Sequence, residues 1–293
     1  MDTLCLCALE RKIERFIHHH HLHRRRPGPP GTLSLAQLTV VCIARAWFGV
    51  EHWKAFFSNP LVQAGWKKLG GFDLGSYGRF MLRQPQALPV LEAWIAHNQQ
   101  PWTGMGAIDS TLVATGKPWT RYDKTKYKRL RREGAGPGYG STGPCFGLKL
   151  HLATTDRGQV HAFCLTPAPC HDLHPVKQGL LDQAVGVVLA DSGYVSQREQ
   201  RRLQAKSVAL WARPARHHEA RFTLAQSRVY RCREVAESIF AKLKQRFSLV
   251  PRWPPRTLTT CQAHILGSLI AYMLHPNKPT MRWSFKDFKE SRS

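Results

Sequence analysis

Apolar residues recur at helical spacing between residues 33 and 100, and this pattern predicts a helical module. The longest apolar segment begins just after Leu33, and Ser34 is a candidate N-cap for it. Gly70 and Gly71 interrupt the pattern, which then resumes. The expected helices are Leu33–Phe48, Glu51–Phe57, Leu61–Leu69 and Ala87–Asn98.

From Gly104 onward, the apolar positions take the spacing and β-branched composition of strands. Three strands follow one another, and strands then alternate with helices, which is typical of a mixed sheet covered by helices, an α/β fold. The expected strands are Met105–Val113, Phe146–Thr154, Gln159–Leu165, Val185–Ala190 and Ser207–Trp211. The expected helices are Asp172–Gln183, Ser196–Ala205 and roughly Thr257–Leu274.

Residues 230–244 contain no Gly or Pro and are rich in helix formers, so they predict one further helix. At about 100° per residue, Tyr230, Arg233, Glu237 and Lys244 share a stripe about 60° wide. An apolar face lies next to this stripe and can dock on a core. Its members are Cys232, Val235, Ala236, Ile239, Phe240, Leu243 and Phe247. For this segment alone, a solvated face with Arg233 and Glu237 paired one turn apart is the simpler interpretation.

Composition shifts divide the chain into four parts. Residues 1–32 are expected to begin with a short helix and to form a flexible basic segment, because a His/Arg run is followed by a Pro/Gly cluster. Residues 33–103 form the helical module, and residues 104–275 form the α/β domain. The basic tail after residue 276 is expected to be loose.

The charge balance points to a polyanionic partner. Lys and Arg number 43 against 19 Asp and Glu, a formal net charge of +24. Nucleic acid is the first candidate, since neutralised phosphates release counterions, and a membrane surface is the second. However, no stretch approaches the roughly 20 apolar residues of a spanning helix. The eight Cys form no CxxC pair, which predicts reduced thiols and a cytoplasmic location.

Three carboxylates occupy positions where a charge is costly unless it is paired or functional. Asp109 lies inside the first expected strand, Asp191 ends the apolar run at Ala190, and Glu237 lies on the helix described above. Together they could supply hard oxygen ligands for two Mg²⁺ or Mn²⁺ ions. Each also has a simpler explanation: a turn at Asp109, turn chemistry between Asp191 and Gly193, and an ion pair at Glu237.

Basic residues also cluster outside the helix. The loop between Asp109 and Phe146 combines cations with interleaved aromatic residues and then a run of small residues. A hairpin lying against DNA and a solvated loop are both open interpretations of it. The further expected DNA contacts are Lys126, Lys128, Arg129, Arg131, Arg132, Lys149, Arg213 and Arg216.

Taken in order, these motifs resemble the DDE transposases of bacterial insertion sequences. Ile108-Asp109-Ser110 resembles the first acidic motif, and Asp191-Ser192-Gly193-Tyr194 resembles the second. Tyr230, Arg233, Glu237 and Lys244 match the Y-(2)-R-(3)-E-(6)-K signature without a gap. His171-Asp172 resembles the family's "HD" turn before the second Asp. The resemblance spans residues 104–274 and is weak over residues 1–100.

The resemblance implies an RNase H-like mixed sheet flanked by helices, with an all-helical N-terminal module for DNA-end binding or dimerisation. It implies an endonuclease that cleaves DNA at transposon terminal inverted repeats and transfers the 3′-hydroxyl into target DNA. Asp109, Asp191 and Glu237 would hold two Mg²⁺ or Mn²⁺ ions, and Tyr230, Arg233 and Lys244 would grip the DNA backbone. The protein would then be a bacterial homodimer on double-stranded DNA, nucleoid-associated when bound, with no membrane partner.

Three alternatives remain open at this stage. One is an RNase H-like nuclease that cuts without joining, and another is a non-catalytic nucleic-acid-binding protein. The third is a basic RNA-binding or ribosome-associated protein, which would explain the charge but not the placement of the acids.

Overall fold

The computed structural model describes residues 5–22, 33–67, 76–115, 128–140, 143–212, 222, 224–251 and 257–282. The chain divides into two compact units. The first contains residues 1–98, 114–133 and 243–275, and the second contains residues 99–113, 134–242 and 276–293. These unit boundaries differ from the expected domain boundaries, because the last long helix belongs with the N-terminal helices.

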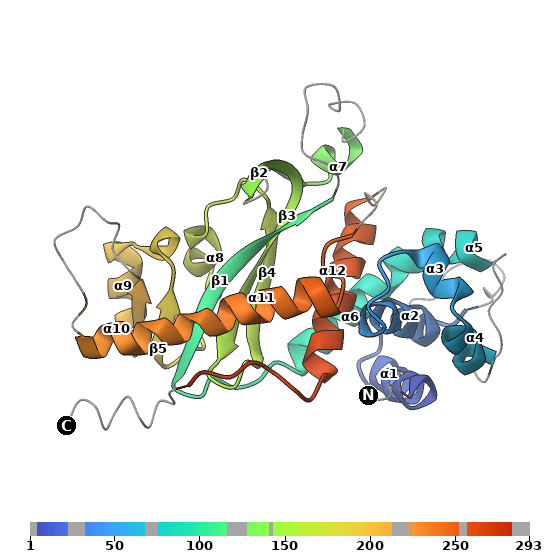
Figure 1. The fold of residues 1–293 in the computed structure, drawn as a ribbon, viewed down its shortest axis with the longest axis horizontal. Coiled ribbons are helices and arrows are strands. Elements are labelled where there is room, and N and C mark those ends of the chain that lie inside the picture. The colour runs from blue at the N-terminus through green and yellow to red at the C-terminus, as the bar shows by residue number, and fades with distance from the viewer. Residues whose placement is uncertain are drawn as a thin grey trace. The chain divides into compact units, whose positions relative to one another are not determined.

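The first unit is helical in its described residues (Figure 1). Its elements are α1 (Leu6–His19), α2 (Leu35–Trp47), α3 (Trp53–Ser58), α4 (Pro60–Lys67), α5 (Ser76–Arg83), the 3₁₀ turn η1 (Gln84–Ala87), α6 (Leu88–His97), α7 (Lys128–Arg132) and α12 (Leu258–Leu274). The four predicted helices before residue 100 are therefore present, while α5 and α7 had no clear signal.

Helices α2 and α12 form the centre of this unit. The predicted cap on α2 is confirmed: Ser34 Oγ accepts from Gln37 N, and Gln37 Oε1 accepts from Ser34 N, which closes a capping box. A Cβ built at Gly267 would lie only 2.6 Å from the carbonyl oxygen of Cys42, so the glycine permits close packing of α12 on α2. Helix α2 buries 11 of its 13 residues, and α12 buries 12 of its 17.

Helix α1 is the helix expected at the start of residues 1–32, and it packs as an ordered part of the unit. Its apolar residues Leu9, Ile13 and Ile17 are buried, and Phe16 contacts the Trp94 ring edge-to-face with ring centroids 5.0 Å apart. Apolar positions spaced three and four residues apart give this helix one buried face, which pins it to the unit. The His/Arg run from residue 23 lies outside the described residues.

Six strands in the described part of the chain form the sheet of the second unit. They are β1 (Met105–Ala114), β2 (Gly136–Gly140), β3 (Gly143–Thr155), β4 (Val160–Pro167), β5 (Gly186–Ala190) and β6 (Val208–Ala212). The order is β2-β3-β1-β5-β6, with β4 also paired to β3. β3 is antiparallel to β2 and β4, whereas β1, β5 and β6 are parallel. The predicted α/β fold, a mixed sheet flanked by helices, is therefore confirmed.

Strand β2 was not predicted, because its sequence of Gly, Pro and Tyr is typical of a loop. It pairs with the start of β3, so the small residues serve close approach. A Cβ built at Gly136 would lie 2.5 Å from Pro169, which leaves no space for a side chain. Tyr139 on this strand is 81% exposed.

The helices of the second unit are α8 (Leu173–Lys177), the 3₁₀ turn η3 (Ser192–Tyr194), α9 (Gln197–Gln204), α10 (Leu224–Tyr230), the 3₁₀ turn η4 (Arg231–Arg233) and α11 (Glu234–Arg246), which continues into the first unit. The predicted helix over Asp172–Gln183 is too long. Gly179 adopts a positive φ of 96° and the N–H of Leu180 bonds back to the Pro175 carbonyl, which ends α8 after Lys177.

No helix in the described ranges is both long and apolar enough to cross a lipid bilayer.

Candidate active site

Two of the predicted acids lie on neighbouring strands, Asp109 in the middle of β1 and Asp191 directly after the end of β5. β1 and β5 run parallel, and their last paired residues are Ile108 and Ala190. Asp109 is the next residue of β1 and Asp191 is the residue that follows β5, so the register brings their backbones side by side, at the roughly 4.8 Å spacing of adjacent strands. The Oδ1 atom of Asp109 accepts from Ser110 N at 2.8 Å, and that of Asp191 accepts from Ser192 N at 2.7 Å. The turn chemistry weighed for Asp191 is therefore present, together with this pairing of neighbouring strands.

The helical segment that follows β6 reaches the same part of the sheet. Tyr230 Oη donates to the carbonyl oxygen of Ala190 at 2.8 Å, which anchors the end of α10 immediately before Asp191. Arg233 Nη1 lies 3.5 Å from Asp109 Oδ2, and Arg233 Nη2 donates to Glu237 Oε1 at 2.5 Å. One guanidinium thus joins an acid of the sheet to the acid of the helix.

The apolar face predicted for this helix is confirmed, since all seven of its members are buried. The backbone differs in one detail from the single helix expected over residues 230–244. A 3₁₀ turn at Arg231–Arg233 separates α10 from α11. The Arg233–Glu237 ion pair is present, but Arg233 also reaches Asp109, which a simple solvated face would not require.

Exposure increases across the site from the sheet outward. The side chain of Asp109 is 17% exposed and that of Glu237 is 56% exposed, while Asp191 is also exposed. The pKa of Asp109 is raised to about 6, mainly by burial and in smaller part by the negative charges of Asp191 and Glu237, while the Ser110 N–H and Arg233 act to lower it. This coupling shows that the three carboxylates share one electrostatic environment.

The three acids fit a divalent cation in the chemistry of their donor atoms, and the register places the backbones of two of them side by side. Carboxylate oxygens are the ligands that Mg²⁺ and Mn²⁺ prefer, and the residues that could hold them are Asp109, Asp191 and Glu237. Within the described residues, no three His, Cys, Asp or Glu side chains are close enough together to hold a metal ion. The guanidinium of Arg233 bridges two of the acids, so side-chain movement would have to accompany ion binding.

The cations predicted to contact DNA fall into several places. Lys244 is exposed on α11, seven residues after Glu237. Lys128, Arg129, Arg131 and Arg132 are all exposed on α7, whose Leu130 is buried. Lys126, Arg213 and Arg216 lie outside the described residues. DNA contact by each of these residues stays a prediction.

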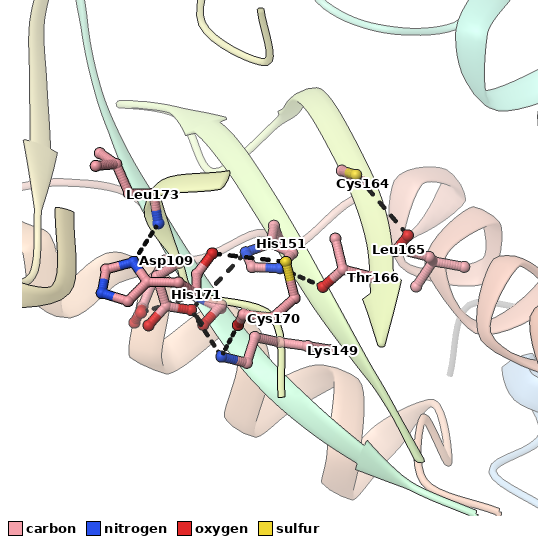
Figure 2. A network of polar contacts seen from close by, with 11 residues as sticks. Asp109, Lys149, His151, Cys164, Leu165, Thr166, Cys170, His171 and Leu173 are labelled. Carbon is pink, nitrogen blue, oxygen red and sulfur yellow. Dashed lines mark hydrogen bonds and ion pairs between the residues drawn. The ribbon is translucent and has the colours of Figure 1, made fainter. Parts of the chain in front are cut away.

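Lys149 has a different environment from the other cations. Its side chain is 15% exposed, and its ammonium group donates to the carbonyl of Cys170 at 2.8 Å and to Asp172 Oδ1 at 3.1 Å (Figure 2). A phosphate contact would require Lys149 to leave both partners, so the geometry gives the predicted DNA contact no support.

Asp172 also belongs to this region, although the sequence pattern does not reveal its contacts. It was noted only as part of an "HD" turn, yet its carboxylate contacts Ser110, the neighbour of Asp109. The signal available in the sequence was an acid immediately before a short helix, which ordinary capping explains equally well.

Residues 99–250, just over half of the chain and the whole site described above, match the family model "Transposase DDE domain". The chain therefore belongs to the DDE transposase family, whose members are enzymes of DNA cleavage and strand transfer and generally use divalent metal ions.

Two solved structures are similar to this chain at low identity. A piggyBac transposase synaptic complex with hairpin DNA is 10% identical, with 92% of this chain and 72% of that chain covered and a TM-score of 0.45. A pre-cleavage Mos1 transpososome is also 10% identical, with 89% and 86% covered and a TM-score of 0.19. At these values neither structure adds to the family assignment. No curated protein sequence matches the chain.

Proposed function

We propose that this transposase is encoded by a bacterial insertion sequence and acts at its terminal inverted repeats. The first reaction is hydrolysis that frees a 3′-hydroxyl, and the second is transfer of that hydroxyl into target DNA. The observation that supports this proposal best is the grouping of Asp109, Asp191 and Glu237 around two neighbouring strands and one helix. Hydrolysis and strand transfer can share such a site, because both displace an oxygen from a phosphodiester.

In this proposal, Asp109, Asp191 and Glu237 hold two Mg²⁺ or Mn²⁺ ions. Bound in pairs, such ions activate a water or hydroxyl nucleophile and stabilise the leaving oxygen. Tyr230 fixes α10 against Ala190, which supports the orientation of the segment that carries Glu237. Arg233 balances the carboxylates in the metal-free protein and, once released from them, contacts the DNA backbone near the cleaved end with Lys244.

The partner in this proposal is double-stranded DNA. The net charge of +24 and the four exposed cations of α7 favour a phosphate backbone as the ligand. Joining two transposon ends calls for two catalytic sites, so we propose a homodimer in the DNA complex. The N-terminal helices would bind DNA ends or join the subunits. Such a protein would work in the cytoplasm, on the nucleoid.

The test is an in vitro reaction with labelled duplexes made from the DNA that flanks the coding sequence, supercoiled plasmid target, and Mg²⁺ or Mn²⁺. Wild-type protein should nick the duplex at one defined position and join the labelled 3′ end to the plasmid. Nicking without joined product would favour an RNase H-like nuclease that only cuts. Salt-dependent binding without any metal-dependent nicking would favour a non-catalytic binding protein.

A further inference from the structure

Asp172 contacts strand β1 at the residue next to the first acid. Its Oδ1 atom accepts a hydrogen bond from Ser110 Oγ at 2.6 Å. The backbone N–H of Ser110 donates in turn to Asp109 Oδ1 at 2.8 Å. Ser110 is therefore held from two sides, by Asp109 through its backbone and by Asp172 through its hydroxyl.

The other oxygen of Asp172 faces the chain that follows the second acid. A Cβ built at Gly193 would lie 3.1 Å from Asp172 Oδ2, so the carboxylate packs directly against this glycine. Gly193 lies two residues after Asp191, and the next residue, Tyr194, is buried. Burial, followed by the charges of Asp172 and Asp109, raises the pKa of the Tyr194 hydroxyl. Asp172 thus lies between the segments that follow the two acids of the sheet.

Lys149 balances the charge of Asp172. Its ammonium group bonds to Asp172 Oδ1 at 3.1 Å and is held on the other side by the Cys170 carbonyl (Figure 2). His151 lies 4.0 Å from the same oxygen, but burial lowers its pKa to about 4, and the charge of Lys149 adds to this lowering. His151 is therefore neutral near pH 7, and Lys149 supplies the positive charge.

Helix capping does not account for Asp172. It is the N-cap residue of α8, a position where Asp normally accepts a hydrogen bond from the first turn, yet its side chain makes no capping bond. His171 takes that role, because its Nδ1 accepts from Leu173 N at 3.2 Å (Figure 2). His171 therefore caps the helix, and the carboxylate of Asp172 is directed at Ser110.

We propose that Asp172 is a positioning residue that fixes Asp109 and Asp191 relative to one another, through Ser110 on one side and Gly193 on the other. It would therefore set the affinity of the site for divalent ions without binding them itself. This inference rests on the proposed metal site of the three acids. Residues that orient metal ligands from outside typically change metal affinity 10–100-fold when they are replaced.

The experiment measures Mn²⁺ binding to the full-length protein by isothermal titration calorimetry, together with the melting temperature of each metal-free variant. Asp172→Asn should weaken Mn²⁺ binding about tenfold or more, and Ser110→Ala should weaken it in the same direction by less. Asp182→Asn is the matched control. Asp182 has a similar exposed fraction, 33% against 30%, and binds Arg202 and Lys206 in an ion-pair network of its own. It should leave Mn²⁺ binding unchanged.

Asp172→Asn also leaves the charge of Lys149 without its carboxylate partner. A second variant separates this effect from the loss of positioning. The double variant Lys149→Gln/Asp172→Asn removes both charges, so it should regain melting temperature while Mn²⁺ binding stays weak. Wild-type affinity in the double variant would overturn the proposal, as would wild-type affinity in both Asp172→Asn and Ser110→Ala. If Asp109→Asn binds Mn²⁺ as well as wild type does, the metal site itself is wrong, which is a different failure.

Discussion

Arg45 in the helical unit and Arg233 in the sheet unit are both cations held by polar neighbours, but their surroundings differ. Arg45 has no exposed surface. Its guanidinium donates to the Val50 carbonyl at 3.0 Å and to Ser268 Oγ at 3.2 Å, lies 3.3 Å from His264 Nε2, and stacks over the Trp53 ring. No carboxylate pairs with it among the described residues. Arg233 is 18% exposed and pairs with two carboxylates, one of which is more than half exposed.

The comparison teaches that a shifted pKa does not by itself mark a catalytic site. Burial lowers the pKa of Arg45 to about 10, and burial raises the pKa of Asp109 to about 6. The difference lies in the neighbours. The partners of Arg45 are neutral and enclosed, whereas Asp109 has two like charges beside it and an open side toward solvent. Three carboxylates that share one guanidinium at an accessible site are a reason to expect a further ligand of positive charge.

The largest expected effect is the loss of strand cleavage when one of the three acids is replaced. Asp109→Asn, Asp191→Asn and Glu237→Gln should each reduce strand cleavage by roughly a thousandfold or more, the scale at which loss of one charge-stabilising group acts. DNA binding should persist, since the positive surfaces remain. The measurement is single-turnover nicking alongside a gel-shift titration. A variant that still nicks at the wild-type rate removes that acid from the active site.

The Arg45 cluster should show the opposite pattern. Arg45→Ala should lower the free energy of unfolding by roughly 3–5 kcal/mol, because it leaves a cavity and several buried polar groups without a partner. Arg233→Ala should cost at most about 1–2 kcal/mol, since its partners can reach water. Urea unfolding of both variants measures the contrast. Equal losses would mean that the two cations play the same structural part.

The pH dependence of stability sharpens the comparison for Asp109. Its folded-state pKa of about 6 lies above its unfolded value, so folding favours the protonated form. The contribution of Asp109 to the free energy of unfolding is therefore fully present below roughly pH 4. It is lost as pH rises through about 6, a loss of roughly 3 kcal/mol in the metal-free protein. Asp109→Asn should remove that slope and stabilise the metal-free protein at pH 7.

Asp182→Asn provides the control for this titration, because the pKa of Asp182 is shifted in the opposite direction. Hydrogen bonds from Lys206 and Arg202 lower the pKa of Asp182, so its contribution is present at neutral pH and lost in acid. Thermal unfolding from pH 4 to pH 7 in the presence of chelator distinguishes the two variants. A slope that survives in Asp109→Asn would assign the titration to another group.

Much of the site could be predicted because its parts are local in sequence. Asp191 follows a continuous apolar run, and Glu237 lies on a helix whose buried face repeats every three to four residues. Periodicity therefore located both elements, and the ordered motifs supplied the grouping. The sequence does not show the strand register. In the folded sheet Ile108 pairs with Ala190, and this pairing brings Asp109 beside Asp191.

What could not be predicted depends on contacts between distant residues. The direction of the Asp172 side chain is decided by Ser110 and Lys149, which are 62 and 23 residues away. The glycine-rich strand β2 forms only because β3 offers a partner, so its own composition argues against it. Burial of Arg45 is likewise decided by α12, more than two hundred residues later.

The smallest expected effect concerns the exposed cations of α7, which belong neither to the Arg45 cluster nor to the group around Arg233. Arg131→Ala and Arg132→Ala should each weaken DNA binding a few-fold and flatten the salt dependence of the association constant by about one ion per lost phosphate contact. Arg129→Ala should do less, because Arg129 is already paired with Glu133 at 2.9 Å. Arg198, exposed on α9, gives the matched control for loss of one surface charge. Binding measured by fluorescence anisotropy between about 50 and 200 mM salt gives the slopes. If all four variants share one slope, α7 is an ordinary charged surface, and DNA contact must be sought elsewhere on the chain.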